Sequence, residues 1–294
     1  MKIFLAGGTG FVGGHVRRAL LERGHTIRLL VHGRKGGYEA AVEPVEGDVA
    51  RLDTFADALV GCDATINLVG IIREFPGRGV TFEKLHVEAT RNVVDGAKQA
   101  GIRRHLQMSA LSTRPNATSR YHQTKWRAEE YVRASGLQWT IFRPSLIFGP
   151  KDAFVNMLAG YIRSLPAVPV IGDGAYRLQP VSADDVARCF TLALEMPETV
   201  GQTYELCGPD RLTYNQLLDT IGRIMGKGHV IKVPQPLALL KLTVPFMQSF
   251  SFFPLTMDQI IMLTEENICT GDWPRVFGFE PEPFEAGVSK YLAP

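Results

Sequence analysis

Apolar and polar positions along the first thirty residues predict a strand, a turn, a helix and a second strand. The run Lys2–Ala6 is short and apolar, and glycines follow it directly. Apolar residues then recur at helical spacing until Gly24, after which a second apolar run covers Thr26–Val31. This order of elements predicts a β-α-β unit at the start of a parallel sheet.

The turn of this unit carries four glycines in the string GGTGFVG. They fit Gly8-x-Gly10-x-x-Gly13 and Gly7-x-x-Gly10-x-x-Gly13 at once. Glycines let the backbone approach a pyrophosphate, and the helix N-terminus offers free N–H groups, so we expect a dinucleotide here rather than a plain glycine turn. The residues expected to bind it in this turn are Gly7, Thr9, Gly10, Phe11, Val12 and Gly13.

Further strands and helices alternate along the chain. Strands are predicted over 41–46, 64–69, 104–108 and 138–143, with helical stretches at 51–60 and 81–100. The pattern predicts a doubly wound parallel α/β sheet of the Rossmann type over 1–150. Residues 151–294 are expected to form mainly a smaller C-terminal α/β lobe for substrate or partner, with some segments returning to the Rossmann sheet.

Composition narrows the possible partners and compartments. The net charge of +2 and the absence of a Lys/Arg cluster argue against nucleic acid. The four cysteines contain no C-x-x-C pair, which suits reduced thiols better than a disulfide framework or a zinc site, and no metal is expected. Met1 leads straight into the first strand, so we expect a cytoplasmic protein without a signal peptide.

The most apolar region of the chain is not expected to cross a membrane. Residues 236–263 are interrupted by Lys241, Pro245, Pro254 and Asp258, so no transmembrane segment is expected. Within it, 236–256 holds more apolar side chains than a small lobe obviously needs. Packing inside the lobe explains them most simply, whereas a membrane-surface or protein partner is the alternative.

The loop after the second strand bears on cofactor choice. A protein specific for NAD usually has an Asp or Glu there for the ribose 2′-hydroxyl, but this chain has His32, Arg34 and Lys35. Their cationic groups suit a 2′-phosphate, although a solvated basic loop is the simpler alternative. We therefore favour NADP(H) over NAD(H).

Tyr121 and Lys125 form the chemical centre of the sequence. Residues four apart share a helix face, so the ammonium can stabilise tyrosinate, lower the tyrosine pKa and reach a nicotinamide ribose. The alternative is an aromatic residue beside a surface lysine. The pair lies on the helix after the fifth strand, which resembles its placement in the short-chain dehydrogenase/reductases, and this resemblance implies an acid/base role.

Six strings in this order resemble the short-chain dehydrogenase/reductases of extended or atypical kind, the NAD-dependent epimerase/dehydratases. They are GGTGFVG, GDV, NLVG, the Tyr121/Lys125 pair, FRPSLIFGP and QPVSADDVA. In finer detail, HLQMSALS and RYHQTK are similar to bacterial relatives of the nucleotide-binding accessory subunit of respiratory complex I.

The resemblance implies further site residues. Ser109, with Ser112 as the alternative, would bind the substrate oxygen beside the catalytic Tyr121 and Lys125. His86 stands where relatives often have an asparagine that supports a proton relay, and we expect it to be structural. The additional cofactor contacts are Asp48, Val49, Leu68, Val69, Gly70, Met108, Pro144 and Ile147.

Two functions remain open at this point. One is an oxidoreductase or epimerase/dehydratase that uses the tyrosine and lysine on an unidentified small-molecule substrate. The other is a catalytically silent NADP(H)-binding module that acts through protein or membrane partners. The sequence specifies neither the substrate nor the oligomeric state.

Overall fold

The computed structural model describes residues 1–33, 36–248 and 255–293. The chain divides into two compact units. The first unit comprises 1–144, 184–205 and 275–277, and the second comprises 145–183, 206–274 and 278–294. Each unit is described by itself.

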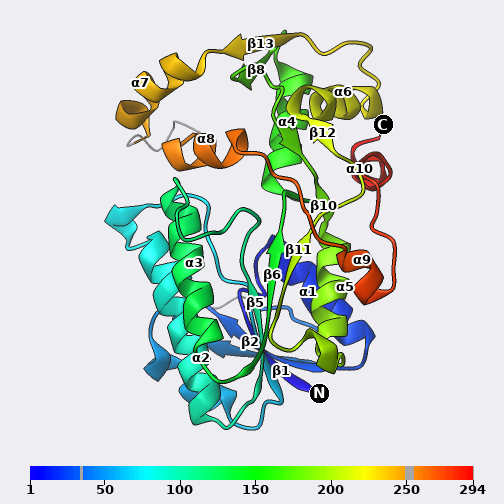
Figure 1. Cartoon of the computed structure of the whole chain (residues 1–294). Coiled ribbons are helices and arrows are strands. Elements are labelled where there is room, and N and C mark those ends of the chain that lie inside the picture. The colour runs from blue at the N-terminus through cyan, green and yellow to red at the C-terminus, as the bar shows by residue number, and fades with distance from the viewer. Residues whose placement is uncertain (34–35, 249–254, 294) are drawn as a thin grey trace. The chain divides into compact units, whose positions relative to one another are not determined.

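The first unit is built on a seven-stranded sheet with the order β11-β6-β5-β4-β1-β2-β3 (Figure 1). Strands β1 to β6 pair in parallel. The strand order changes direction between β1 and β4, which is where open α/β sheets bind their ligands. The strands are β1 (Lys2–Ala6), β2 (Thr26–Val31), β3 (Val42–Glu46), β4 (Ala64–Asn67), β5 (Arg104–Met108), β6 (Gln138–Pro144) and β11 (Gln202–Leu206).

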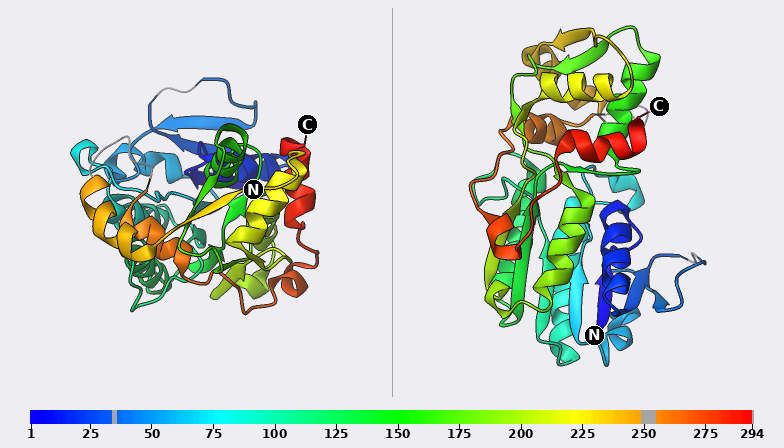
Figure 2. Two further views of the ribbon diagram at one scale, coloured as in Figure 1. Left: turned by 90° about the horizontal axis from the view of Figure 1, so that it is seen from above. Right: turned by 90° about the vertical axis from the view of Figure 1, so that its right-hand side faces the viewer.

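Helices cover both faces of this sheet, which explains the almost wholly apolar β1, whose Ile3 and Phe4 are fully buried. The two helices α1 (Phe11–Glu22) and α5 (Ala183–Ala193) lie side by side on one face (Figure 2). The other face carries α2 (Ala89–Gln99) and α3 (Arg120–Arg133). The predicted doubly wound parallel sheet is therefore confirmed.

Two predicted helices differ from the observed elements. The helix expected over 51–60 is a pair of 3₁₀ turns, Leu52–Thr54 and Ala56–Leu59. Phe55 separates them because its backbone, at a φ of −141° and a ψ of 3°, is not helical, and its ring is buried against Phe4. The helix expected over 81–100 begins as a π-helix at Glu83–Glu88 and continues as α2.

The second unit has its own apolar core among three helices, with Leu158, Leu217 and Phe284 fully buried there. The helices are α4 (Ala153–Ser164), α6 (Tyr214–Ile224) and α10 (Phe284–Leu292). Three short strand pairs accompany them: β7 (Ile147–Phe148) with β10 (Val181–Ser182), β9 (Arg177–Leu178) with β12 (Leu212–Thr213), and β8 (Val168–Ile171) with β13 (Lys232–Gln235).

The apolar region of the second unit forms α7 (Leu237–Met247) and α8 (Met257–Thr264), and α9 (Trp273–Phe277) follows later in the chain. Of the expected patch at 236–256, residues 249–254 lie outside the described residues. Among the helices that the structure describes, none combines the length and the apolar character needed to cross a membrane.

The expectation of four reduced thiols is wrong for two cysteines. Cys207 and Cys269 form a disulfide across a sequence separation of 62 residues. Both are buried, and the Trp273 indole donates a hydrogen bond of 2.9 Å to the Cys207 carbonyl. A motif search for closely spaced cysteines misses such a pair because chain folding alone brings the two together. Cys62 and Cys189 are free and buried.

Candidate active site

The glycine turn is packed too tightly for side chains at two positions. Gly7 has a φ of +80°, and a Cβ there would lie 2.9 Å from the backbone of Leu68 and Val69. A Cβ on Gly13 would lie 2.3 Å from the Gly7 carbonyl oxygen. The first glycine therefore lets the turn meet the end of β4, and the last lets α1 pack onto the turn.

The start of α1 presents backbone donors outward. Thr9 and Gly10 are exposed, and Gly10, the N-cap of α1, has extended backbone and no capping side chain. The first N–H groups of a helix lack intrahelical partners, and the helix dipole favours an anion beside them. The first turn of α1 contains no acidic residue that would compete with a phosphate. The turn fits a dinucleotide pyrophosphate.

Most predicted cofactor residues lie at one edge of the sheet. The strands β1 to β6 run in parallel, so their carboxyl ends share this edge, with the glycine turn after β1, His32 after β2 and Asp48 after β3. Leu68, Val69 and Gly70 follow β4, Met108 ends β5, and Pro144 ends β6. Ile147 belongs to the second unit, whereas Arg34 and Lys35 lie outside the described residues.

Asp48 stabilises its own turn. Its Oδ1 accepts a hydrogen bond of 2.9 Å from the Ala50 N–H, and its N–H donates to Thr54 Oγ1 at 2.9 Å. The Lys84 ammonium is 3.9 Å from Oδ2. These contacts hold a turn and do not cap a helix, since Arg51 is the N-cap of Leu52–Thr54. The adenine contact of Asp48 stays a prediction.

Tyr121 lies on the first turn of α3, which begins after Ser119. The Ser119 side chain caps this helix by accepting a hydrogen bond from the His122 N–H. The Tyr121 ring is 8% exposed and makes edge contacts with Phe82 and His86, with ring centroids 5.8 and 5.2 Å away. Among the described residues, the Tyr121 hydroxyl has no hydrogen-bond partner.

The protonation behaviour of Tyr121 differs from the expectation. Burial raises the pKa of Tyr121 to about 12, whereas the sequence predicted a lowering by Lys125. In the protein alone, loss of hydration for the phenolate outweighs the neighbouring ammonium. The hydroxyl of this residue therefore stays protonated at neutral pH and can act as an acid.

Lys125 is buried one helical turn further along α3. Its ammonium donates to the carbonyl oxygens of Val69 and Met108, each at 3.4 Å. Burial lowers the pKa of Lys125 to about 8. A Cβ on Gly70 would lie 2.9 Å from this ammonium, so the glycine leaves room for it.

His86 joins the same cluster from the π-helix. Its Nδ1 is 2.9 Å from Thr124 Oγ1, and its Nε2 is 3.1 Å from the Ile71 carbonyl oxygen. Burial, reinforced by Lys125, lowers the pKa of His86 to about 2, so the imidazole is neutral. A neutral His86 packed against Tyr121 is compatible with a structural role, which stays a prediction.

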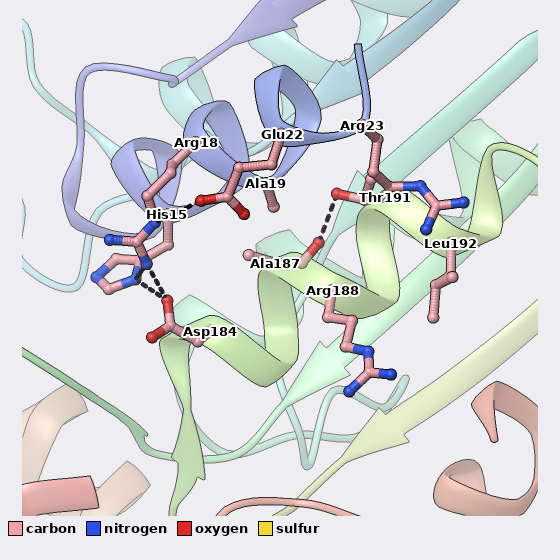
Figure 3. A pocket seen from close by; sticks show the side chains of 10 residues that line it. All are labelled: His15, Arg18, Ala19, Glu22, Arg23, Asp184, Ala187, Arg188, Thr191 and Leu192. Carbon is pink, nitrogen blue, oxygen red and sulfur yellow. Dashed lines mark hydrogen bonds and ion pairs between the residues drawn. The ribbon is translucent and has the colours of Figure 1, made fainter. Parts of the chain in front are cut away.

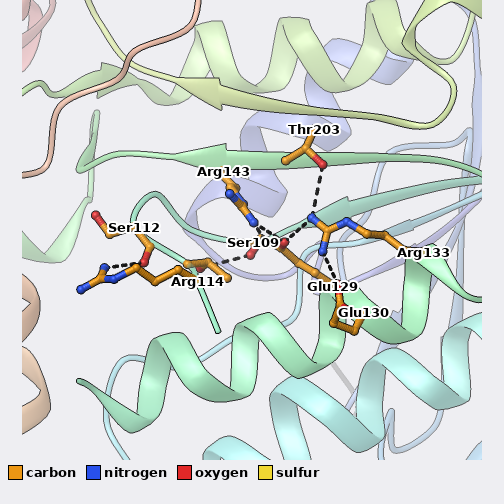
Figure 4. A network of polar contacts seen from close by, with 9 residues as sticks. Ser109, Ser112, Arg114, Glu129, Glu130, Arg133, Arg143 and Thr203 are labelled. Carbon is orange, nitrogen blue, oxygen red and sulfur yellow. Dashed lines mark hydrogen bonds and ion pairs between the residues drawn. The ribbon is translucent and has the colours of Figure 1, made fainter. Parts of the chain in front are cut away.

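The two candidate serines occupy different environments (Figure 4). Ser109 is 4% exposed, and its Oγ is 3.5 Å from Thr113 Oγ1. Ser112 is half-buried in the left-handed region at a φ of 66°, and its carbonyl accepts from Arg114. Thr113, which the sequence did not single out, adds a second hydroxyl beside Ser109. No spacing motif includes such a threonine.

A buried carboxylate fixes α3 to the sheet (Figure 4). The side chain of Glu129 is 1% exposed and accepts hydrogen bonds from Arg133 at 2.6 Å and from Arg143 on β6 at 2.6 and 2.9 Å. The Trp126 ring lies against both guanidinium groups. This network anchors the helix that carries Tyr121 and Lys125.

A pocket of about 600 Å³ lies elsewhere, between the outer faces of α1 and α5 (Figure 3). Its charged side chains are paired: Asp184 with His15 and Arg18, and Arg23 with Glu195. None of the predicted site residues lines it. Most of the predicted site residues lie instead at the carboxyl edge of the sheet.

Comparisons with known proteins identify the family of the chain. A protein-family profile described as NAD(P)H-binding matches residues 7–197. The mitochondrial NADH dehydrogenase [ubiquinone] 1 alpha subcomplex subunit 9 of Arabidopsis thaliana is 29% identical over 90% of this chain and 69% of the relative. A ceramide reductase of Caulobacter vibrioides is 27% identical over 80% of this chain and 74% of the relative.

A solved structure supports the fold. The UDP-glucose 4-epimerase of Thermotoga maritima, with UDP-glucose, covers 99% of this chain and 97% of its own, with a TM-score of 0.78 and 19% identity. The glycine turn, the parallel sheet and the match over 7–197 lead to one conclusion. The chain belongs to the NAD(P)H-binding family of extended short-chain dehydrogenase/reductases.

Proposed function

We propose that this protein is an NADP(H)-dependent oxidoreductase or epimerase/dehydratase with Tyr121 as its acid/base. The observation that carries the proposal is the pairing on α3 of a buried tyrosine, whose hydroxyl has no partner among the described residues, with a buried lysine. A bound nicotinamide would supply or accept the hydride. Tyr121 would give a proton to the substrate oxygen or take one from it.

Lys125 and Ser109 support this step. The ammonium at the ends of β4 and β5 would bind a ribose and stabilise tyrosinate as it forms. Ser109, or Ser112 in its place, would donate a hydrogen bond to the substrate oxygen. The Ser109 hydroxyl lies 3.5 Å from Thr113 Oγ1. The substrate would be a small molecule with a carbonyl or alcohol.

The acid/base role is tested by Tyr121→Phe. The change removes one hydroxyl, so NADPH affinity should stay nearly constant while turnover falls by about 10²–10⁴-fold. Tyr131→Phe is the matched control, because Tyr131 is on the same helix with its hydroxyl bonded to Asp95. Turnover is measured as NADPH oxidation in a screen of sugars, quinones and small carbonyls. Activity that survives Tyr121→Phe undiminished contradicts the proposal.

Lys125→Ala tests the two proposed roles of the lysine, which are ribose binding and stabilisation of tyrosinate. Loss of the ammonium should weaken NADPH binding as well as turnover, because both the ribose contact and the support of tyrosinate disappear. Calorimetric titration with NADPH measures the first effect without a substrate. Binding unchanged in Lys125→Ala would remove the lysine from the nucleotide site.

The preference for NADP(H) rests on sequence. No acid follows β2, while His32 is exposed and Arg34 and Lys35 add two cations. Arg34→Ala should lower the ratio of NADPH to NADH affinity, at a cost of about 1.5–3 kcal/mol for one charged hydrogen bond. An unchanged ratio in titration calorimetry rules this assignment out.

A second candidate function is a silent NADP(H)-binding module with a membrane-surface or protein partner. The observation favouring it is the exposure of three apolar side chains on α7: Leu239 at 51%, Leu242 at 68% and Phe246 at 74%. Their spacing places them on one helix face. In this function Tyr121→Phe would change neither nucleotide binding nor partner binding.

A further inference from the structure

Two buried amides lie directly beneath the proposed site. Asn67 ends β4 and is fully buried, and Gln107 on β5 is 1% exposed. The two residues face each other in the parallel register of these strands, and Asn67 Nδ2 donates to Gln107 Oε1 at 3.1 Å. Buried amides are costly unless every polar atom is paired, so their contacts decide their role.

The orientation of Asn67 follows from a backbone donor. The Val69 N–H donates to Asn67 Oδ1 at 3.1 Å, and a backbone N–H can only donate. Asn67 Nδ2 must then point to the other side, where it meets Gln107 Oε1 and Thr90 Oγ1. Gln107 Nε2 is left to donate to the Met108 carbonyl oxygen at 3.1 Å.

His105, two residues earlier on β5, also contacts the Gln107 amide. Its Nε2 is 3.2 Å from Gln107 Oε1, and its Nδ1 is 2.8 Å from Thr65 Oγ1. Burial lowers the pKa of His105 to about 4, so at neutral pH the ring carries one proton, which Nε2 donates to the amide oxygen. Gln107 Oε1 thus accepts from two donors, and a flipped amide would face both of them with its NH₂ group.

The two amides make hydrogen bonds to the residues whose carbonyl oxygens accept from Lys125. Asn67 binds the N–H of Val69, and Gln107 binds the carbonyl of Met108. The Lys125 ammonium donates to the carbonyl oxygens of these same two residues, Val69 and Met108. The bond between Asn67 and Gln107 therefore connects the two residues whose carbonyl oxygens accept hydrogen bonds from the lysine.

We propose that Asn67 and Gln107 are positioning residues. Their hydrogen-bonded pair, called the brace below, holds the Lys125 ammonium in position for nucleotide binding. This role rests on the proposed function, because it places Asn67 and Gln107 at the nucleotide site to which Lys125 is assigned. Neither amide touches the substrate or the cofactor in this role. They act through the carbonyl groups of Val69 and Met108, which lie where β4 and β5 end.

The test compares two variants of the brace with a control in the same sheet. Gln107→Met keeps the length and volume of the side chain and removes the amide, and Asn67→Leu does the same on β4. Thr140→Val is the control, because Thr140 is fully buried on β6 and bonds to Thr199 and Arg104, away from Lys125. All three should lower the unfolding midpoint.

Two readouts separate positioning from mere stability. One is the dissociation constant for NADPH. The other is the pH profile of Lys125 acetylation by acetic anhydride, measured without nucleotide by peptide mass spectrometry. We expect Gln107→Met and Asn67→Leu to weaken NADPH binding about 10-fold, as for one lost hydrogen bond. They should also move the acetylation midpoint upward from about 8 as the released ammonium reaches water.

The outcomes test the role of the brace separately from the proposed function. If Gln107→Met behaves like Thr140→Val, with a lower unfolding midpoint but the acetylation profile and NADPH affinity of the unaltered protein, the brace is refuted. If the unaltered protein binds no NADPH, the proposed function fails. The acetylation midpoint still tests the brace in that case, because its measurement needs neither nucleotide nor substrate.

Discussion

The two units of this protein stabilise themselves in different ways. The first has a seven-stranded sheet with buried polar pairs: Asn67 bonds to Gln107 between β4 and β5, and Glu129 on α3 bonds to Arg143 on β6. The second has strand pairs of two to four residues, a disulfide and a helix with three exposed apolar side chains. The first unit is thus held by buried polar pairs around a long sheet, whereas the second relies on a crosslink and short strand pairs.

The disulfide offers the sharpest test of this contrast. Reduction, or Cys207→Ser, should destabilise the second unit by about 2–4 kcal/mol, because the crosslink closes a long loop in the unfolded chain. NADPH affinity, a property of the first unit, should change little. Alkylation and mass spectrometry before and after reduction count the thiols, and denaturant unfolding gives the stability. Cys189→Ala, which alters a free buried cysteine, is the control.

A pair of neighbouring glycines tests the first unit in turn. Gly13→Ala places a Cβ 2.3 Å from the Gly7 carbonyl oxygen, which should cost about 1–3 kcal/mol and disturb the phosphate turn. Gly14→Ala, one residue on, meets no atom within 4 Å and should stabilise α1 by up to about 1 kcal/mol. Unfolding curves and NADPH titration distinguish them, and equal effects of the two changes would refute the tight packing of the turn.

The same contrast explains which features could be predicted from sequence. Apolar periodicity and the glycine spacing predicted the strands, the turn and the Tyr121/Lys125 helix because local sequence encodes them. The brace of Asn67 and Gln107 could not be foreseen, since 40 residues separate its members and only the register of β4 and β5 brings them together. Cys207 and Cys269 were misjudged for the same reason.

The pKa of Tyr121 was predicted in the wrong direction because sequence carries no measure of burial. Spacing on a helix shows that a lysine is near, and Coulomb attraction then lowers the tyrosine pKa. Hydration lost on burial acts in the opposite direction, and it dominates here. Proximity can therefore be predicted from a motif, but the balance of desolvation and charge needs the packed structure.

One buried histidine of the first unit, His86, predicts a smaller, pH-dependent effect. The folded-state pKa of His86 is about 2, below the ordinary 6.5, so the unfolded chain binds a proton that the folded chain does not. Stability should be constant above pH 6.5 and fall below it, by at most about 1.4 kcal/mol per pH unit from this residue. His86→Asn should flatten the dependence, measured by unfolding at pH 7 and pH 5. An unchanged slope would show that His86 does not resist protonation.

The smallest effect is expected at the exposed face of α7 in the second unit. Leu242→Ser and Phe246→Ser should change the free energy of unfolding by no more than about 0.5 kcal/mol, because both side chains are largely in water already. Val244→Ser, on the same helix, should cost much more, since Val244 is fully buried with Ile171 and Ile260. If the exposed face meets a membrane surface, the first two changes should instead reduce co-sedimentation with phosphatidylcholine vesicles, with or without phosphatidylglycerol, at physiological salt. Failure of the unaltered protein to bind either vesicle would exclude the membrane surface and leave a protein partner for this face.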